Sequence, residues 1–422
     1  MVEFRVATYN VLSSSLADPP RFPECDPKHL DAPTRLERVK AKLHEEVRKE
    51  AVLCLQEVST LWVGELHVFF MSKGYAFVPA NYGNARSGYM GVALAWPLAK
   101  YEAVTVDITR LSDTRKWGAR MREQPPSHPS PQTPAVPASP TAVAAVAAWA
   151  GVGAGQGWEW GGPVALLMEL AGRAKKRRRE EKEGDTPVRS DRAAVVEEED
   201  PWQMAARRFN QALFVRLHPK GTAGRNGVPN GSLNGSPDEG SEPVYGVQGT
   251  EKDPGRTQGQ VFCVGTYHVP CMFNHPPVMV LHTSMLVKHL ARLAGSDPLV
   301  IAGDFNFNPA SDCYKIVTEG DLSDSSPDFP ERPEWEQGWS AATGVKLLSA
   351  YKEVEGTEPD FTNNAKVEQW PPFIDTLDYI FHTPNLRATK VLPLKHRNEV
   401  QGPFPTETEP SDHVLLAAEY SM

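Results

Sequence analysis

Short apolar runs of strand length recur along most of the chain and constrain its fold more than any other feature. Such runs predict β-strands, and they are Phe4–Tyr9, Val52–Gln56, Ala76–Pro79, Gly91–Trp96, Arg207–Leu217, Val261–His268, Leu299–Ala302, Leu377–His382 and Leu415–Glu419. Fewer segments have apolar residues at helical spacing, and these are Leu36–Glu50, Trp62–Lys73 and Val280–Ala294. Because the strands outnumber the helices and do not alternate with them strictly, we expect an α+β fold. Its architecture is a four-layer α/β sandwich, in which two mostly antiparallel sheets pack face to face between outer helices.

Two stretches between these runs have compositions that predict disordered insertions. Residues 119–206 contain a Pro/Ser/Thr tract, an Ala/Gly/Trp tract and blocks of like charge, and residues 218–259 are rich in Gly, Asn, Ser and Pro. Neither composition buries enough apolar surface to offset the entropy lost on ordering. About 290 residues remain without them, within the range of one domain. We therefore expect a single domain over 1–422, interrupted by these two insertions.

The charge, the cysteines and the hydropathy exclude several classes of protein. Lys and Arg total 44 against 53 Asp and Glu, so the net charge of −9 excludes a globally basic nucleic-acid coat. Five scattered cysteines without a C-x-x-C pair argue against a disulfide framework or a zinc ribbon. No signal peptide is evident, and the uncharged stretch 141–158 is mainly Ala and Gly, which does not predict a membrane span.

These features predict an intracellular protein of the cytoplasm, the nucleus or both. The basic run Lys175–Arg179 is consistent with a nuclear-import signal or with a solvated charge run balanced by neighbouring glutamates. Both interpretations stay open, as does the oligomeric state.

Polar residues follow several of the predicted strands, which is where scaffolds usually carry chemistry. They stand at five places: Thr8-Tyr9-Asn10, Gln56-Glu57, Thr266-Tyr267-His268, Gly303-Asp304-Phe305-Asn306 and Ser411-Asp412-His413. Each one alone is typical of a helix cap or a turn. Their occurrence together at strand ends predicts a functional site instead.

The chemistry of these side chains indicates a metal-assisted reaction at a phosphate. Mg²⁺ prefers carboxylate and amide oxygens, which Asn10, Glu57 and Asp412 supply. Asp304 and Asn306 lie two residues apart and face the same side of an extended chain, so they can activate a water and orient a phosphate oxygen together. Histidines such as His268 and His413 suit phosphate contact or proton transfer.

This motif set resembles the endonuclease/exonuclease/phosphatase superfamily, which includes pancreatic deoxyribonuclease and the abasic-site endonucleases. Within it the set is most similar to the deadenylase branch with nocturnin, the Angel proteins and 2′-phosphodiesterase. The resemblance rests on the segments Ala7–Leu12, Leu55–Val58, Gly265–His268, Ala302–Asn306, Thr376–Phe381 and Pro410–His413.

The resemblance implies a role for each matching residue. Glu57 is the principal metal ligand with Asn10 and Asp412 beside it, and the ion is Mg²⁺, for which Mn²⁺ can substitute. Asp304 polarises the attacking water and Asn306 holds the scissile phosphate. His268 contacts the phosphate or the leaving oxygen, and His413, oriented by Asp378, binds a non-bridging oxygen. Asn210 is a candidate substrate contact.

The resulting hypothesis is a Mg²⁺-dependent hydrolase of phosphodiester bonds, of the RNA 3′-end exonuclease or deadenylase-like type, with RNA or a nucleotide as its partner. Two alternatives stay open: a phosphatase acting on a small phosphorylated nucleotide, and a catalytically inactive scaffold. The chain has no leucine-rich array, so docking into a large deadenylase complex through one is not expected. The residues Ser87–Leu94 also depart from the Lys-x-Asp-Gly-type segment of deadenylases.

Overall fold

The computed structural model describes residues 2–118, 200–220 and 261–422. The predicted insertions lie almost wholly outside these described residues, as do the run 175–179 and the stretch 141–158. Among the helices that are described, none is long and apolar enough to cross a membrane.

The amino-terminal and carboxyl-terminal parts of the chain share one six-stranded sheet. β1 lies near its centre and pairs antiparallel with the last strand, so that Glu3 faces Ser421. In spatial order the strands are β13 (Arg387–Val391), β14 (Leu416–Ser421), β1 (Glu3–Asn10), β2 (Val52–Val58), β4 (Gly91–Pro97) and β3 (Tyr75–Asn81).

The middle of the chain builds a second six-stranded sheet. Its spatial order is β5 (Tyr101–Arg110), β6 (Gln211–Pro219), β7 (Phe262–His268), β8 (Leu299–Asp304), β12 (Asp378–His382) and β9 (Leu348–Ser349). A separate small hairpin joins β10 (Asn363–Ala365) to β11 (Phe373–Asp375).

Each large sheet contains one parallel pair, and every other pairing in it is antiparallel. The parallel pairs are β1 with β2 and β7 with β8. Parallel strands end at the same edge of a sheet, so the polar residues at the carboxyl ends of these four strands gather at two facing edges. This arrangement positions the site.

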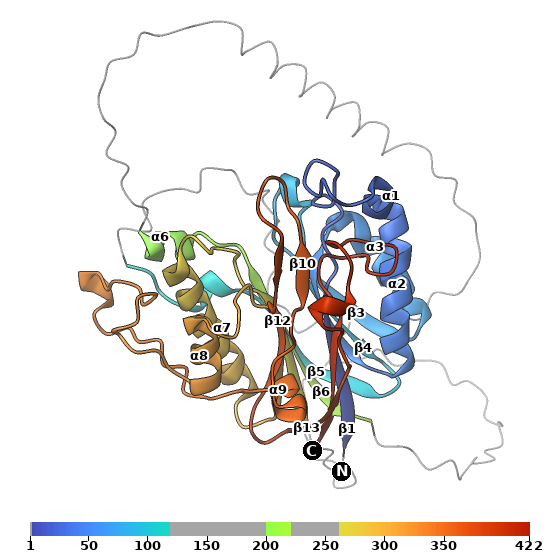
Figure 1. Cartoon of the computed structure of the whole chain (residues 1–422). Coiled ribbons are helices and arrows are strands. Elements are labelled where there is room, and N and C mark those ends of the chain that lie inside the picture. Colours follow the sequence, from blue (N-terminus) through green and yellow to red (C-terminus); the bar gives the residue numbers. More distant parts are fainter. Residues whose placement is uncertain (1, 119–199, 221–260) are drawn as a thin grey trace, which may run out of the picture. The chain divides into compact units, whose positions relative to one another are not determined.

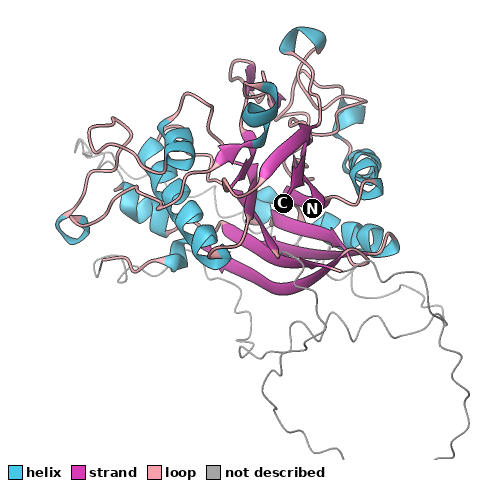
Figure 2. Cartoon of the chain, turned by 90° about the horizontal axis from the view of Figure 1, so that it is seen from below, coloured by secondary structure: helices cyan, strands magenta, loops and turns pink. Residues whose placement is uncertain are grey.

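Helices cover the outer face of each sheet, which gives four layers (Figures 1 and 2). Apolar residues of α2 and α3 pack on the first sheet, and those of α7 and α8 pack on the second. The helices are α1 (Pro27–Leu30), α2 (Ala32–Arg48), α3 (Thr60–Ser72), α6 (Pro201–Ala206), α7 (Pro276–Ala294), α8 (Asp312–Glu319) and α9 (Ala350–Glu355), with 3-10 turns η1 (Ala85–Ser87), η2 (Leu111–Thr114), η5 (Glu334–Glu336) and η6 (Arg397–Glu399).

Aromatic side chains fill the space between the two sheets. The ring of Phe4 on β1 stacks on Phe262 of β7 with centroids 4.1 Å apart, and Tyr101 of β5 packs edge-on against Phe262 at 5.3 Å. Burying side chains of this size contributes about 1.5–3 kcal/mol each. The sheets are therefore held face to face by the side chains that point inward, which belong to every second residue of a strand.

The predicted sandwich is confirmed, and three details of the sequence interpretation differ from the structure. The expected insertion ran to residue 206, but Pro201–Ala206 forms helix α6, which Asp200 caps and whose Trp202 is buried against α7. A six-residue helix is too short to give a periodic signal, so composition alone missed it. The second stretch, expected from 218, starts after β6 ends at Pro219, and strand β5 was not predicted at all.

The burial of Trp202 generates a test of the insertion boundary. Replacing residues 119–199 by a short Gly/Ser linker should leave the melting temperature nearly unchanged, because their composition predicts no core. Replacing 119–206 should destabilise the protein by about 3–5 kcal/mol, since that deletion removes a buried Trp. Thermal unfolding of the two variants decides the point, and equal melting temperatures would contradict it.

Candidate active site

Strand register brings the predicted residues together at the carboxyl ends of the central strands. His268 and Asp378 are both directly paired with Asp304 across the second sheet. Asn10 ends β1 opposite Gln56 on the first sheet, whose side chain donates to Thr266 of the second at 3.0 Å. The site thus lies where the ends of the two sheets meet.

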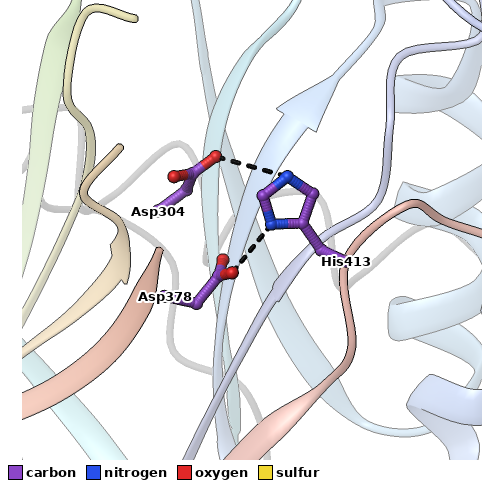
Figure 3. A group of neighbouring side chains, drawn as sticks. All are labelled: Asp304, Asp378 and His413. Carbon is purple, nitrogen blue, oxygen red and sulfur yellow. Dashed lines mark hydrogen bonds and ion pairs between the residues drawn. The ribbon is translucent and has the colours of Figure 1, made fainter. Parts of the chain in front are cut away.

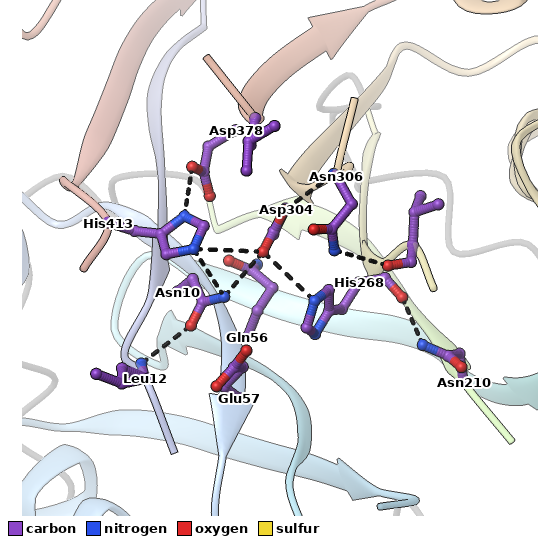
Figure 4. Close-up of polar contacts among 12 residues, drawn as sticks. Asn10, Leu12, Gln56, Glu57, Asn210, His268, Asp304, Asn306, Asp378 and His413 are labelled. Atoms are coloured by element: carbon purple, nitrogen blue, oxygen red, sulfur yellow. Dashed lines mark hydrogen bonds and ion pairs between the residues drawn. The ribbon is translucent and has the colours of Figure 1, made fainter. Parts of the chain in front are cut away.

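Asp304 stands at the centre of this cluster (Figure 4). It is 1% exposed, and its Oδ2 accepts a 2.9 Å hydrogen bond from the amide nitrogen of Asn10. The same oxygen lies 3.4 Å from His268 Nε2 and 3.7 Å from His413 Nε2. Three side chains from different parts of the two sheets therefore converge on one carboxylate oxygen.

His413 and Asp378 form a short buried pair (Figure 3), in which His413 Nδ1 lies 2.7 Å from Asp378 Oδ2. Burial alone lowers the pKa of His413, but the charges of Asp378, Asp304 and Asp412 outweigh this and raise it well above the usual value. Burial raises the pKa of Asp378 to about 6, against the opposing charge of His413. The Nε2 atom of the same ring lies 3.7 Å from Asp304 Oδ2 and 3.5 Å from the amide nitrogen of Asn10.

The Gly-Asp-Phe-Asn segment needs its residue types for geometric reasons. A Cβ at Gly303 would lie 2.2 Å from the carbonyl oxygen of Tyr267, so only glycine permits this approach of β7 and β8. Asn306 has φ +53° and donates its backbone N–H to Asp304 Oδ1. Its amide nitrogen donates to the carbonyl of Val269 at 2.8 Å, which fixes the side chain at the site.

Glu57 also lies in an unusual backbone conformation. The pairing of β2 with β4 is irregular between Leu55 and Val58, and Glu57 has φ +59° there. Strained residues of this kind cost about 1–3 kcal/mol and cluster at functional sites. Glu57 Oε2 accepts the backbone N–H of Ser13 at 3.0 Å, so its carboxylate is held beside the loop that follows β1.

The predicted ligands Asn10, Glu57 and Asp412 fit a hard divalent cation. All three offer oxygen donors, which Mg²⁺, Mn²⁺ and Ca²⁺ prefer. Burial raises the pKa of Asp412, His413 opposes the rise, and the charge of Glu57 adds to it. A bound cation would stabilise two carboxylates that repel one another in a buried site.

A second group of side chains also has metal-ligand spacing. One ligand atom each from Asp304, Asp378 and His413 lie within 4.8 Å of one another. These three side chains already contact one another, because His413 lies 2.7 Å from Asp378 and 3.7 Å from Asp304. That Asn10, Glu57 and Asp412 hold the cation instead stays a prediction.

Asn210 lies beside the site, but its side chain contacts other residues of the protein, whereas the sequence predicted a contact with substrate. Its amide nitrogen donates to the backbone carbonyl of His268 at 2.8 Å and lies 3.4 Å from the hydroxyl of Tyr82. These contacts brace His268, whose Nδ1 is buried and has no hydrogen-bond partner within the described residues. A direct contact of Asn210 with substrate stays a prediction.

Sequence reasoning missed Arg35, a fully buried cation on α2. Its guanidinium donates to the carbonyls of Val11, Leu12 and Pro410, each at 2.7 Å. It thereby joins the loop after β1 to the loop that carries Asp412 and His413. Burial lowers its pKa to about 10, so it stays charged at neutral pH. In sequence it is one arginine in an ordinary amphipathic helix, and no signal distinguishes it.

Two exposed aromatic residues stand near the site. Phe273 follows β7 by five residues and is 53% exposed, and Phe373 on β11 is 40% exposed. Their ring centroids lie 6.5 Å apart. Asp375 Oδ2 of the same strand accepts a 3.3 Å hydrogen bond from Asn308, two residues after Asn306. The pair offers apolar ring faces near the polar cluster.

Comparison with known proteins identifies relatives of this arrangement. A sequence model described as the Endonuclease/Exonuclease/phosphatase family matches residues 189–413. Curated relatives include the CCR4-Not complex 3′-5′-exoribonuclease subunit Ccr4 of Aspergillus niger, 37% identical over 133 residues, and that of Aspergillus terreus, 36% identical over 133 residues. Each alignment covers 30% of this chain but only 19% and 18% of the relative, so the chain spans about a fifth of their length.

Among solved structures, the chain is similar to ANGEL2, a 2′,3′-cyclic phosphatase, in complex with adenosine-2′,3′-vanadate. The TM-score is 0.58 at 17% identity, covering 99% of this chain and 95% of that one. This likeness shows the fold. The family model covers more than half of the chain, and so the family predicted from the motifs is confirmed.

The contacts of Arg35 generate a stability prediction. Arg35→Met should lower the free energy of unfolding by about 3 kcal/mol, because three buried carbonyls lose a charged donor. Arg38→Met is the matched control on the same helix, since Arg38 is only partly buried and should cost less than about 1 kcal/mol. Urea unfolding measures the free energy of unfolding of both variants. Equal losses would show that the buried hydrogen bonds of Arg35 contribute no extra stability.

Proposed function

Because the chain belongs to the endonuclease/exonuclease/phosphatase family, we propose that it is a Mg²⁺-dependent phosphodiesterase that removes nucleotides from the 3′ end of RNA. One observation carries the proposal. Asn10, His268 and His413 all converge on the buried carboxylate of Asp304. This arrangement holds a base and cationic or amide donors around one point, as phosphate hydrolysis requires.

Asp304 and Asn306 have complementary tasks in this proposal. Asp304 accepts the proton of the attacking water, and the donors around it fix the direction of its Oδ2. Asn306 Nδ2 has a second hydrogen beyond the one given to Val269, and this hydrogen is available to a phosphate oxygen. The two residues share one rigid turn, so base and phosphate contact keep a constant separation.

The imidazolium of His413 contributes positive charge where negative charge develops. Its Nδ1–H is taken by Asp378, which leaves Nε2–H for a non-bridging phosphate oxygen. Asp378 is in turn held by the hydroxyl of Thr362 at 2.7 Å. Asp378 therefore acts through His413, as a positioning residue. His268 contacts the phosphate or the leaving oxygen.

A divalent cation held by Glu57, Asn10 and Asp412 would supply Lewis-acid stabilisation of phosphate charge. Glu57 is held by Ser13, and Asn10 Oδ1 accepts the backbone N–H of Leu12 at 3.0 Å. The loop after β1 thus orients two of the three proposed ligands.

Two observations favour RNA as the substrate. The curated relatives that align at 36–37% identity are 3′-5′-exoribonuclease subunits. The exposed rings of Phe273 and Phe373 lie beside the site, and aromatic faces of this kind stack on nucleobases. A panel of poly(A), a 2′,5′-linked oligomer and NADPH with Mg²⁺ tests the choice. Stepwise shortening of 5′-labelled poly(A) is expected, whereas phosphate release from NADPH alone would support the small-nucleotide phosphatase instead.

Metal dependence follows from the all-oxygen ligand set. We expect EDTA to abolish RNA hydrolysis and Mg²⁺ or Mn²⁺, but not Zn²⁺ alone, to restore it. Glu57→Gln should weaken Mg²⁺ activation and remove most turnover, whereas Glu65→Gln, at an exposed glutamate of α3, should behave as wild type. Activity is measured against Mg²⁺ concentration. Full activity of a metal-stripped sample would contradict the proposal.

The separate roles of Asp304 and Asn306 predict mutants that differ in kind. Asp304→Asn should lower kcat by about 10²–10⁴-fold while RNA still binds, because only the base is lost. Asn306→Ala should lower both kcat and affinity, since its donor acts in the ground state and the transition state. His413→Ala should resemble Asn306→Ala, with Asp378→Asn milder. Steady-state kinetics and RNA binding separate these cases, and near-wild-type kcat in Asp304→Asn would exclude the proposed base.

A further inference from the structure

The side chain of Tyr82 stands beside the active site, next to Asn210. Tyr82 follows β3 directly, and its hydroxyl accepts a 3.4 Å hydrogen bond from the amide nitrogen of Asn210. The same nitrogen donates to the backbone carbonyl of His268 at 2.8 Å (Figure 4). One side chain therefore separates the Tyr82 hydroxyl from His268.

The backbone around Tyr82 is tied to the strand that carries Glu57. Asn81 ends β3, and its amide nitrogen donates at 2.9 Å to the carbonyl of Val58, the residue after Glu57. The backbone N–H of Tyr82 donates to the carbonyl of Met90 at 3.1 Å, just before β4 begins. The ring itself packs against the apolar core between the two sheets. Tyr82 is therefore held in a fixed position between the end of β2 and the polar cluster of the second sheet.

The Tyr82 hydroxyl still has a hydrogen to donate. A phenol hydroxyl is both a donor and an acceptor. Across residues 2–118, 200–220 and 261–422, Tyr82 accepts from Asn210, and its own hydroxyl hydrogen has no acceptor within hydrogen-bond distance. Burial raises the pKa of Tyr82, and the charges of Glu57 and Asp304 raise it further. The hydroxyl therefore stays protonated at neutral pH, in the field of two carboxylates of the site.

We propose that Tyr82 is a catalytic residue whose hydroxyl donates a hydrogen bond to an oxygen of the scissile phosphate. The carboxylates of Glu57 and Asp304 repel a phosphate, and a neutral donor in their field offsets part of this repulsion. Such a donor binds more strongly as negative charge develops on the phosphate oxygens in the transition state. This inference rests on the part of the proposed function that concerns phosphodiester hydrolysis, and it holds for any substrate that carries this bond.

Tyr82→Phe removes the hydroxyl and keeps the ring in the core. We expect it to lower kcat/KM about 10²-fold, the loss typical of one donor to a developing oxyanion, for RNA and for bis(p-nitrophenyl) phosphate alike. The melting temperature should stay unchanged, because the ring still packs between the sheets. Tyr89→Phe, at a 52% exposed tyrosine of the same β3–β4 loop, is the matched control and should keep wild-type activity.

A double-mutant cycle with Asn210→Ala separates a contact with the phosphate from an indirect effect through Asn210. If Tyr82 touches the phosphate, Tyr82→Phe should cause the same loss of kcat/KM with and without the Asn210 side chain. A loss that disappears in the Asn210→Ala background would overturn the proposal. Wild-type kcat/KM in the single variant Tyr82→Phe would overturn it as well.

Phosphate binding separates this inference from the proposed function. Calorimetry with inorganic phosphate and Mg²⁺ should show about 2- to 10-fold weaker binding to Tyr82→Phe than to the wild type, which corresponds to one hydrogen bond. A wild-type protein that hydrolyses bis(p-nitrophenyl) phosphate but not RNA would refute only the RNA substrate. Equal phosphate affinities of the wild type and Tyr82→Phe would refute the contact of Tyr82 with phosphate.

Discussion

The hydrogen bond from Asn10 to Asp304 joins the ends of two sheets, and the site depends on the packing that permits it. Asn10 ends a strand of one sheet and Asp304 ends a strand of the other, yet their side chains meet at 2.9 Å. They meet because the central parallel pairs, β1 with β2 and β7 with β8, terminate at facing edges. The stacked rings of Phe4 and Phe262 lie at the opposite, amino-terminal ends of β1 and β7, where they help to hold the two sheets face to face. The core between the sheets thus also permits the polar cluster around Asp304 to form.

Burying several carboxylates together requires positive charge, and the chain supplies it at two points. His413 pairs with Asp378, and the charges of Asp378 and Asp304 raise the pKa of its ring well above the usual value. Arg35 interacts electrostatically with the carboxylates of Asp412 and Glu57. Without a cation, Asp412 and Glu57 still repel each other. The remaining negative charge therefore favours the divalent ion that the oxygen ligands suit.

The sequence was sufficient for features that repeat along a strand or stand at its end. Short apolar runs predicted the two sheets, and the polar residues at the ends of β1, β2, β7 and β8 predicted which side chains converge. A contact between one side chain and a distant backbone carbonyl leaves no pattern in the sequence. Neither the role of Arg35 nor the contact of Asn210 with His268 could therefore be predicted. Helix α6 was missed because its stability comes from the burial of Trp202 against α7, a tertiary contact, and not from helical periodicity.

The charge near a given point of the surface also depends on tertiary contacts that the sequence alone does not show. A net charge of −9 describes the whole chain, whereas a strand of RNA experiences the field within about 10 Å of its path. The fold brings Arg110 beside the turn that precedes β6 although the two lie far apart in sequence, because β5 and β6 are paired from Tyr101–Pro219 to Arg110–Gln211. The charge that a phosphate meets on this surface therefore depends on which side chains the fold brings together, and the net charge of the whole chain does not determine it.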